Sequence, residues 1–130
     1  MTETKLTKEY TVTPERLASA VKSGSLPVLA TPMVAAFFEE TAAALAQTYL
    51  KEGETTVGSK IAVVHLAPTL PGERVTVTAH LLEQSGKIFR FQLEAEDGAG
   101  LAATATHERV AVNAERFMQK AEARKGSGNA

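Results

Sequence analysis

The sequence predicts a single α+β domain in which an antiparallel sheet wraps around one long helix. Two observations support this prediction: residues 31–50 are Ala-rich with helical periodicity, and residues 57–112 alternate between apolar and polar positions as strands do. Residues 5–13 are rich in Thr, Tyr and Val, which predicts a further strand before the helix. The chain has 130 residues, the length of one domain.

The long helix is predicted from Thr31 to about Leu50. Thr31-Pro32 is a favourable start, because Thr can cap the free amides and Pro fits the first turn. Apolar side chains then recur at helical spacing, at Val34, Phe37, Phe38, Ala42, Leu45, Ala46 and Tyr49. The segment KEGETT, residues 51–56, has the Gly and the charges that end a helix. A short helical turn is also predicted within residues 14–24.

Four strands are predicted between Val57 and Val112, with turns at Pro71-Gly72, Ser85-Gly86 and Asp97-Gly98. In the second and third strands every other residue is apolar, which indicates one buried face: Val75, Val77, Ala79, Leu81, Phe89, Phe91, Leu93 and Ala95. The first strand, KIAVVHLA, is apolar on both faces, so we expect a central strand covered by the helix and by a second surface, which a partner subunit could provide.

A closing helix is predicted from residue 113 to about 122. One domain is therefore expected over residues 1–122, followed by a mobile polar tail over residues 123–130. A long helix followed by an antiparallel meander, with one more strand before it, is the hotdog arrangement. The sheet would have exposed edges, and two copies paired edge to edge would remove them, so we expect a homodimer.

Composition excludes several classes of function. The 14 basic and 15 acidic residues are spread evenly, without the basic tract that nucleic-acid binding requires. There is no cysteine, and the three histidines lack metal-binding spacing, so we expect no disulfide, thiol nucleophile or metal site. No apolar stretch approaches the roughly 20 residues of a membrane span, and the first residues do not resemble a signal peptide. We therefore expect a cytoplasmic protein with no nucleic-acid or membrane partner.

Three residue types suit acyl transfer, namely Thr31 and Glu39 on the long helix and His65 in the apolar strand. Each also has an ordinary structural explanation: Thr31 as a helix cap, Glu39 as part of a solvated face, and His65 as a core histidine. Eight helical residues span about 12 Å, so Thr31 and Glu39 cannot share a hydrogen bond if both are regular helix positions.

His107 and Arg109, in the segment THERV, are expected to mark the solvent-exposed end of the last strand. Arg109 is a candidate ion-pair partner for an acid or for a substrate phosphate. A surface Arg with no fixed partner is an equally simple interpretation. His80 lies on a polar strand face and is expected to be exposed.

Three segments together resemble the fluoroacetyl-coenzyme A thioesterase family of hotdog proteins: ATPMVAAFFEETA, TVGSKIAVVHLAPTLPGERVTVTAHL and THERVAVNAERFMQK. The resemblance extends from about residue 10 to residue 120. It implies a homodimeric acyl-CoA thioesterase with no metal and an active site at the subunit interface. The family's catalytic Thr, Glu and His correspond to Thr31, Glu39 and His65, and its substrate-positioning Gly corresponds to Gly58.

The chain departs from that family at two points. Leu26 is the nearest bulky residue in SGSLPVLAT, where the best-known member has a phenylalanine lid, and Pro32 replaces a Gly. We therefore expect hydrolysis of a short-chain acyl-CoA thioester, with Gly58, Leu26 and Arg109 as substrate-binding residues and no cofactor, since CoA is part of the substrate. The alternatives are a non-catalytic module that binds an acyl thioester or another small ligand and, less favoured, a hydratase or isomerase, whose usual Asp and His are absent from TPMVAAFFEE.

Overall fold

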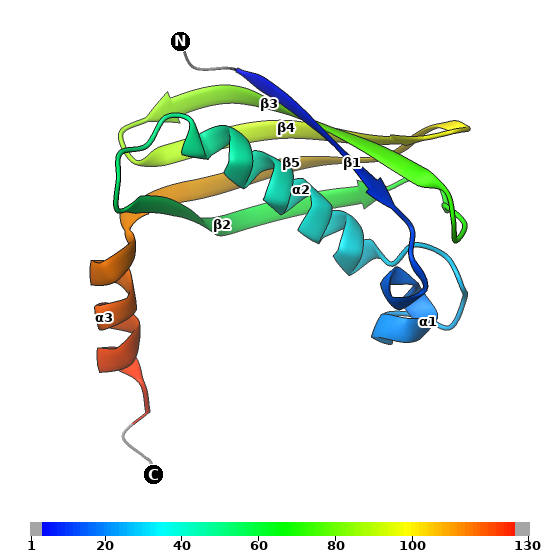
Figure 1. The fold of residues 1–130 in the computed structure, drawn as a ribbon, viewed down its shortest axis with the longest axis horizontal. Helices are drawn as coiled ribbons and strands as arrows, with labels where there is room; N and C mark the ends of the chain where they lie inside the picture. Colours follow the sequence, from blue (N-terminus) through cyan, green and yellow to red (C-terminus); the bar gives the residue numbers. More distant parts are fainter. Residues whose placement is uncertain (1–3, 127–130) are drawn as a thin grey trace.

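The computed structural model describes residues 4–126, which form five strands, three helices and one 3-10 turn (Figure 1). In chain order they are β1 (Lys5–Thr11), η1 (Pro14–Arg16), α1 (Ala18–Val21), α2 (Thr31–Gln47), β2 (Glu54–His65), β3 (Arg74–Ser85), β4 (Ile88–Asp97), β5 (Gly100–Asn113) and α3 (Ala114–Arg124). All the predicted elements are present. The long helix ends three residues earlier than expected, at Gln47.

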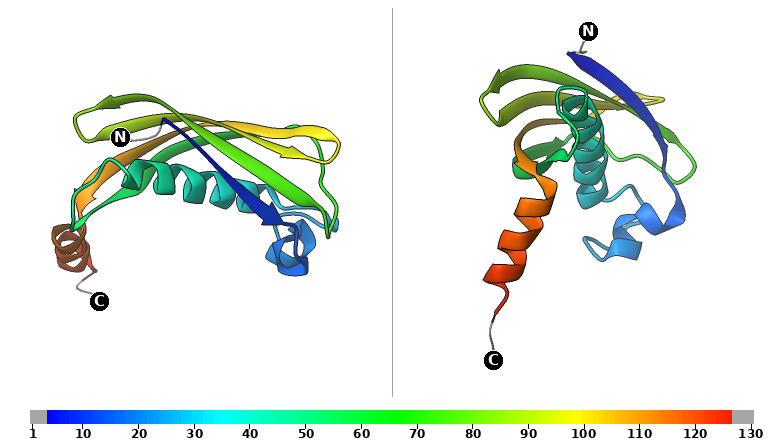
Figure 2. Two further views of the ribbon diagram at one scale, coloured as in Figure 1. Left: turned by 45° about the horizontal axis from the view of Figure 1, so that its top comes forward. Right: turned by 60° about the vertical axis from the view of Figure 1, so that its left-hand side comes forward.

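The five strands form one antiparallel sheet in the order β1-β3-β4-β5-β2. The sheet curves over α2, which crosses its concave face (Figures 1 and 2). The predicted α+β arrangement is thus confirmed. The prediction of a central strand for KIAVVHLA is wrong, because β2 is an edge strand. Its second apolar face is partly open, and the Val64 side chain is among the exposed large hydrophobic residues.

The core lies between α2 and the inner face of the sheet. Side chains at helical spacing point from α2 toward the strands and are buried: Val34, Phe37, Phe38, Thr41, Ala42, Leu45 and Ala46. The apolar side chains of β3 and β4 pack against this face of α2. As the alternation predicted, those from Val75 to Ala79 and from Phe89 to Ala95 are buried. This packing fixes α2, and therefore the side chains at its start, against the sheet.

The pairing of β2 with β5 is irregular at one point. Gly58 pairs with Arg109 and Lys60 pairs with Glu108, so Ser59 is an extra residue in β2. Such a bulge locally disrupts the ladder and bends the strand.

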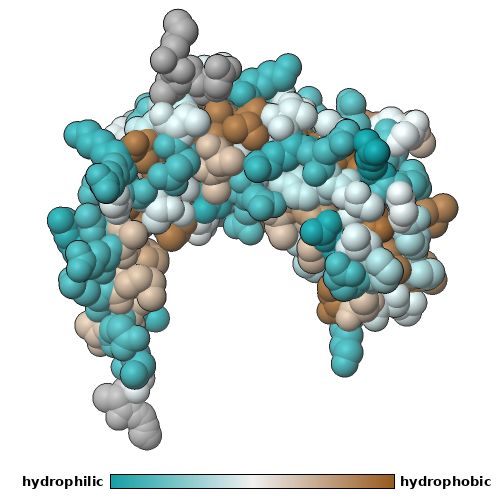
Figure 3. Space-filling view, in the orientation of Figure 1, coloured by the Kyte–Doolittle hydropathy of each residue, from teal (hydrophilic) through white to brown (hydrophobic). Residues whose placement is uncertain are grey.

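Two projections extend from the same side of the domain, α3 at one end and the η1–α1 segment at the other (Figure 1). Between them the space-filling view shows an open arch (Figure 3). The α3 helix continues to Arg124, two residues into the segment predicted to be a tail. Residues 127–130 of that segment lie outside the described part of the chain. Within residues 4–126 no helix combines the length and the hydrophobicity needed to cross a membrane.

Candidate active site

Thr31 and His65 meet where α2 begins and β2 ends. Thr31 Oγ1 lies 2.8 Å from Nδ1 of His65, which is hydrogen-bonding distance. The N-cap of α2 is Ala30, and no side chain caps this helix end. The predicted capping role of Thr31 is therefore wrong. Thr31 is the first helical residue, so its hydroxyl is available to the imidazole.

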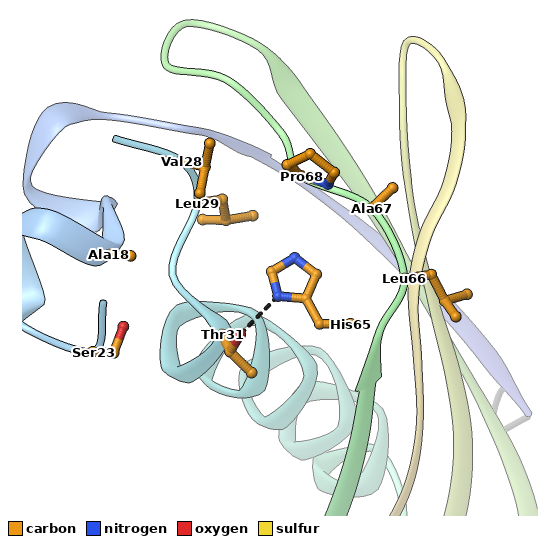
Figure 4. A pocket seen from close by; sticks show the side chains of 9 residues that line it. All are labelled: Ala18, Ser23, Val28, Leu29, Thr31, His65, Leu66, Ala67 and Pro68. Carbon is orange, nitrogen blue, oxygen red and sulfur yellow. Dashed lines mark hydrogen bonds between the residues drawn. The ribbon is translucent and has the colours of Figure 1, made fainter. Parts of the chain in front are cut away.

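A hollow of about 300 Å³ adjoins this pair (Figure 4). Its walls come from α1, the loop before α2 and the segment after β2, through Ala18, Ser23, Val28, Leu29, Leu66, Ala67 and Pro68. The His65 ring lies between Thr31 and the segment around Pro68 (Figure 4). Its second nitrogen is directed away from Thr31. That nitrogen, Nε2, is buried and has no hydrogen-bond partner among the described residues. A buried polar atom without a partner is unusual and is suited to a ligand or a water.

The surroundings of His65 favour its neutral form. Burial lowers the pKa of His65, and the backbone of Ala67 opposes this effect. A neutral imidazole can accept a proton from the Thr31 hydroxyl or from a water molecule. The pair thus has the hydrogen bond and the charge state that a general base requires.

Glu39 belongs to a second group of residues, two turns further along α2. Its Oε2 lies 3.9 Å from Nη1 of Arg109, so Glu39 on α2 and Arg109 on β5 form an ion pair. A Cβ atom at Gly58 would lie 2.7 Å from the same oxygen, so only glycine leaves room for this carboxylate position. The Glu39 side chain is 43% exposed, which leaves it accessible to a substrate or a water.

The structure keeps these two groups apart within one chain. Thr31 and Glu39 both occupy regular positions of α2, and their backbones are therefore about 12 Å apart. The sequence prediction that they cannot share a hydrogen bond is consistent with this geometry. Leu26 does not line the hollow, and it is 66% exposed. Its role in substrate binding stays a prediction.

His107 and Arg109 are not at a solvent-exposed strand end, and that prediction is wrong. They are only 4% and 8% exposed, because the inward phase of β5 continues through both residues. Arg109 bonds Thr56 and His107 and is not a surface Arg without a partner. Its predicted ion pair with an acid is present, 3.9 Å from Glu39, and its role in substrate binding stays a prediction. His80, expected to be exposed, is partly buried and lies 3.4 Å from Glu94.

Thr56 and His107 are site residues that the sequence reasoning missed. The signal for His107 was present: it shares its two-residue phase with Ala103, Ala105 and Ala111, all buried. Polar residues on a buried phase indicate a satisfied polar network. Across residues 4–126 no three His, Asp or Glu side chains are grouped so that they could hold a metal ion.

Comparisons with known proteins identify the family of this chain. The family model described as fluoroacetyl-CoA-specific thioesterase matches residues 12–115. The fluoroacetyl-CoA thioesterase of Streptantibioticus cattleyicolor is 36% identical over 93 residues, which are 72% of this chain and 67% of that protein.

Solved structures give the same result. A solved structure of a fluoroacetyl-CoA thioesterase superposes with a TM-score of 0.89 at 28% identity, covering 97% of this chain and 98% of the other. A thioesterase superfamily member from Thermus thermophilus has a TM-score of 0.85 at 28% identity, covering 95% and 94% of the two chains. The fold is the hotdog fold, and the chain belongs to the fluoroacetyl-CoA-specific thioesterase family.

Proposed function

We propose that this protein hydrolyses a short-chain acyl-CoA thioester to the free acid and CoA. The observation that carries the proposal is the 2.8 Å contact between Thr31 Oγ1 and His65 Nδ1 beside a small hollow. Family membership supports thioester hydrolysis, and the modest size of the hollow supports a short acyl group. The reaction consumes one water, and CoA is part of the substrate, so no further cofactor is proposed.

In the proposed reaction His65 accepts a proton from an oxygen nucleophile that attacks the thioester carbonyl carbon. That nucleophile is either the Thr31 hydroxyl, giving an acyl-Thr31 ester that water then hydrolyses, or a water molecule positioned by Thr31. In both routes the C–S bond breaks and the proton is returned to the CoA sulfur. Gly58 is proposed to help hold the carbonyl through its backbone amide.

We further propose a homodimer in which each active site combines residues of two subunits. The free edge of β2 faces the arch between α3 and α1, where a second copy has room (Figure 1). Val64 and Leu66, on either side of His65, are 54% and 55% exposed, an apolar surface that a partner would cover.

Symmetry then relates the two groups of site residues. Gly58 and His65 lie on the same edge strand, and Glu39 reaches Gly58. A two-fold axis near Ile61 and Ala62 would set His65 of one copy opposite Gly58 of the partner subunit. Glu39 of the partner subunit would thereby approach Thr31. Within one chain, Glu39 is too far from Thr31 to act on it.

Hydrolysis is tested with purified protein, a panel of acyl-CoA esters of increasing chain length and a thiol-reactive dye. Release of CoA from short esters, strongly reduced in Thr31→Ala, Glu39→Gln and His65→Ala and unchanged in His80→Ala, is expected. If no ester is hydrolysed, the proposed thioesterase activity is refuted. Thermal stabilisation by CoA esters without turnover would instead support the non-catalytic binding module.

The shared site is tested by mixing two inactive variants, Thr31→Ala and Glu39→Gln, after unfolding and refolding them together. Random mixing makes half of the dimers mixed, and each mixed dimer has one site with both native residues. Recovery of about a quarter of the wild-type rate is therefore expected. No recovery would show that each site lies within one chain. A cytoplasmic location remains a prediction.

A further inference from the structure

His107 and Arg109 form a buried polar network that reaches Glu39. The Arg109 guanidinium is held on β2 by Thr56, with Nε donating to Oγ1 at 2.7 Å and Nη2 donating to the carbonyl oxygen at 3.0 Å. Its remaining nitrogen, Nη1, lies 3.2 Å from Nε2 of His107 and 3.9 Å from the Glu39 carboxylate. A single nitrogen of Arg109 therefore faces both the histidine and the Glu39 carboxylate.

The partners of His107 define its protonation. Nδ1 lies 2.7 Å from the Lys60 carbonyl, which can only accept, so Nδ1 carries a proton. Nε2 faces the Arg109 guanidinium, which can only donate, so Nε2 is unprotonated. The ring is thus fixed as one neutral tautomer. A second proton, on Nε2, would point a donor and a positive charge at Arg109.

The charges around His107 come from four elements. Arg109 and Glu108 are near it on β5, and Glu39 acts on it from α2. Lys60 of β2 and Arg90 of β4 line a second hollow, separate from the one beside Thr31, to which His107 also contributes. Burial lowers the pKa of His107, and Arg109 acts in the same direction. The Lys60 carbonyl, Glu39 and Glu108 oppose that shift. The neutral ring required by the hydrogen bonds is therefore also the form favoured by burial.

We propose that His107 is a positioning residue for the thioesterase reaction, which acts by orienting Arg109 so that Arg109 holds the Glu39 carboxylate beside Gly58. The inference rests on the proposed thioesterase function and on the catalytic role that the family resemblance implies for Glu39. Three contacts carry it: His107 Nε2 to Arg109, Arg109 to Glu39, and the 2.7 Å approach of Glu39 to the position of a Cβ on Gly58. Protonation of His107 releases Arg109 and displaces the carboxylate.

Two variants separate positioning from folding. His107→Gln retains an acceptor for Arg109 and cannot titrate, whereas His107→Leu removes the acceptor. For His107→Leu we expect kcat to fall about ten- to a hundredfold with little change in KM, since a small displacement of a catalytic group has such an effect. His107→Gln should restore most of kcat, and its kcat should lose one ionisation on the acid side. The matched control is His80→Leu, which should have wild-type kinetics.

Dependence on Glu39 is tested by a double-mutant cycle. In a Glu39→Gln background, His107→Leu should cause no further loss of the residual single-turnover rate. An equal loss in both backgrounds would overturn the proposal, as would wild-type kcat in a folded His107→Leu protein. If His107→Leu fails to fold, a His107→Gln protein with the wild-type pH profile overturns it.

The tautomer gives a readout that does not depend on activity. Nitrogen-15 NMR of the wild-type protein at neutral pH should show His107 protonated on Nδ1, and a ring protonated on Nε2 would overturn the proposal. Because this measurement needs no substrate, it distinguishes failure of the His107 network from failure of the proposed function, which would appear as absence of acyl-CoA hydrolysis by the wild type.

Discussion

The Thr31 hydroxyl is hydrogen-bonded to His65 Nδ1 at 2.8 Å, although 34 residues separate the two in the chain. The contact joins the first residue of α2 to the last residue of β2. Since Ala30 is the N-cap, the hydroxyl has a role outside helix capping, which makes its removal a clean test of chemistry.

Thr31→Val keeps the branched shape and removes the hydroxyl. We expect kcat to fall at least about a hundredfold, the usual contribution of such proton-transfer groups. The free energy of unfolding should change by no more than about 1 kcal/mol, because the substitution removes one hydrogen bond and does not remove a helix cap. Thr31→Ser should retain most activity. Thioester assays and urea unfolding measure both, and an active Thr31→Val protein would exclude Thr31 from the reaction.

The pH dependence of activity should reflect His65. Burial lowers the pKa of His65, so the neutral base persists to lower pH than a free imidazole does. In the His107→Gln protein, where His107 cannot titrate, the acid limb of kcat/KM should therefore have its midpoint below about 6.5. Adding His80→Gln should leave that midpoint unchanged. A midpoint above that value would contradict the assignment of His65 as the base.

Gly58→Ala should impair catalysis while leaving the fold intact. The new Cβ would lie 2.7 Å from Oε2 of Glu39, and the flexible carboxylate must move away from Arg109 or from Gly58. We expect kcat to fall roughly tenfold or more, since correct placement of catalytic groups is worth that much. Gly98→Ala is the matched control, because no atom lies within 4 Å of a Cβ there. Equal kinetics for the two variants would argue against a catalytic Glu39.

Phe38→Ala tests the core that holds α2 on the sheet. Phe38 is fully buried, and truncation should lower the free energy of unfolding by about 3–5 kcal/mol. Phe117→Ala on α3 is the control: this ring is 40% exposed, and a change of roughly 1 kcal/mol or less is expected. Urea unfolding at one fixed protein concentration compares them, and similar losses would contradict the described packing.

Local patterns predicted most of the fold. The alternation in β3 and β4 and the helical spacing in α2 identify most of the buried residues, because one sheet face and one helix stripe supply the core. Thr41 is buried without having been predicted, and Tyr49 and Leu81 are only partly buried. The position of β2 at the sheet edge could not be read in this way. Apolar residues on both faces indicate that both faces are covered, and the covering surface need not be a strand of the same chain.

The sequence was sufficient to predict which residues belong to the site. It was not sufficient to predict which of them contact one another. Thr31 and His65 were identified by type, yet their hydrogen bond depends on how α2 lies across the sheet, which no local pattern encodes. The sequence prediction places His107 at the solvent-exposed end of the last strand. Its strand phase contradicted that assignment and was the better guide, because hydrogen bonds to Lys60 and Arg109 make its burial possible.

The extra residue in β2, Ser59, changes which side chains of the strand face the same side of the sheet. Gly58 and His65 are seven positions apart, an odd number, so in a regular strand they would face opposite sides of the sheet. Ser59 adds the one residue that returns them to the same side, where Glu39 approaches Gly58 and Thr31 bonds His65. Loss of Ser59 from the chain would turn either the imidazole or the glycine away from α2, whatever side chains were kept.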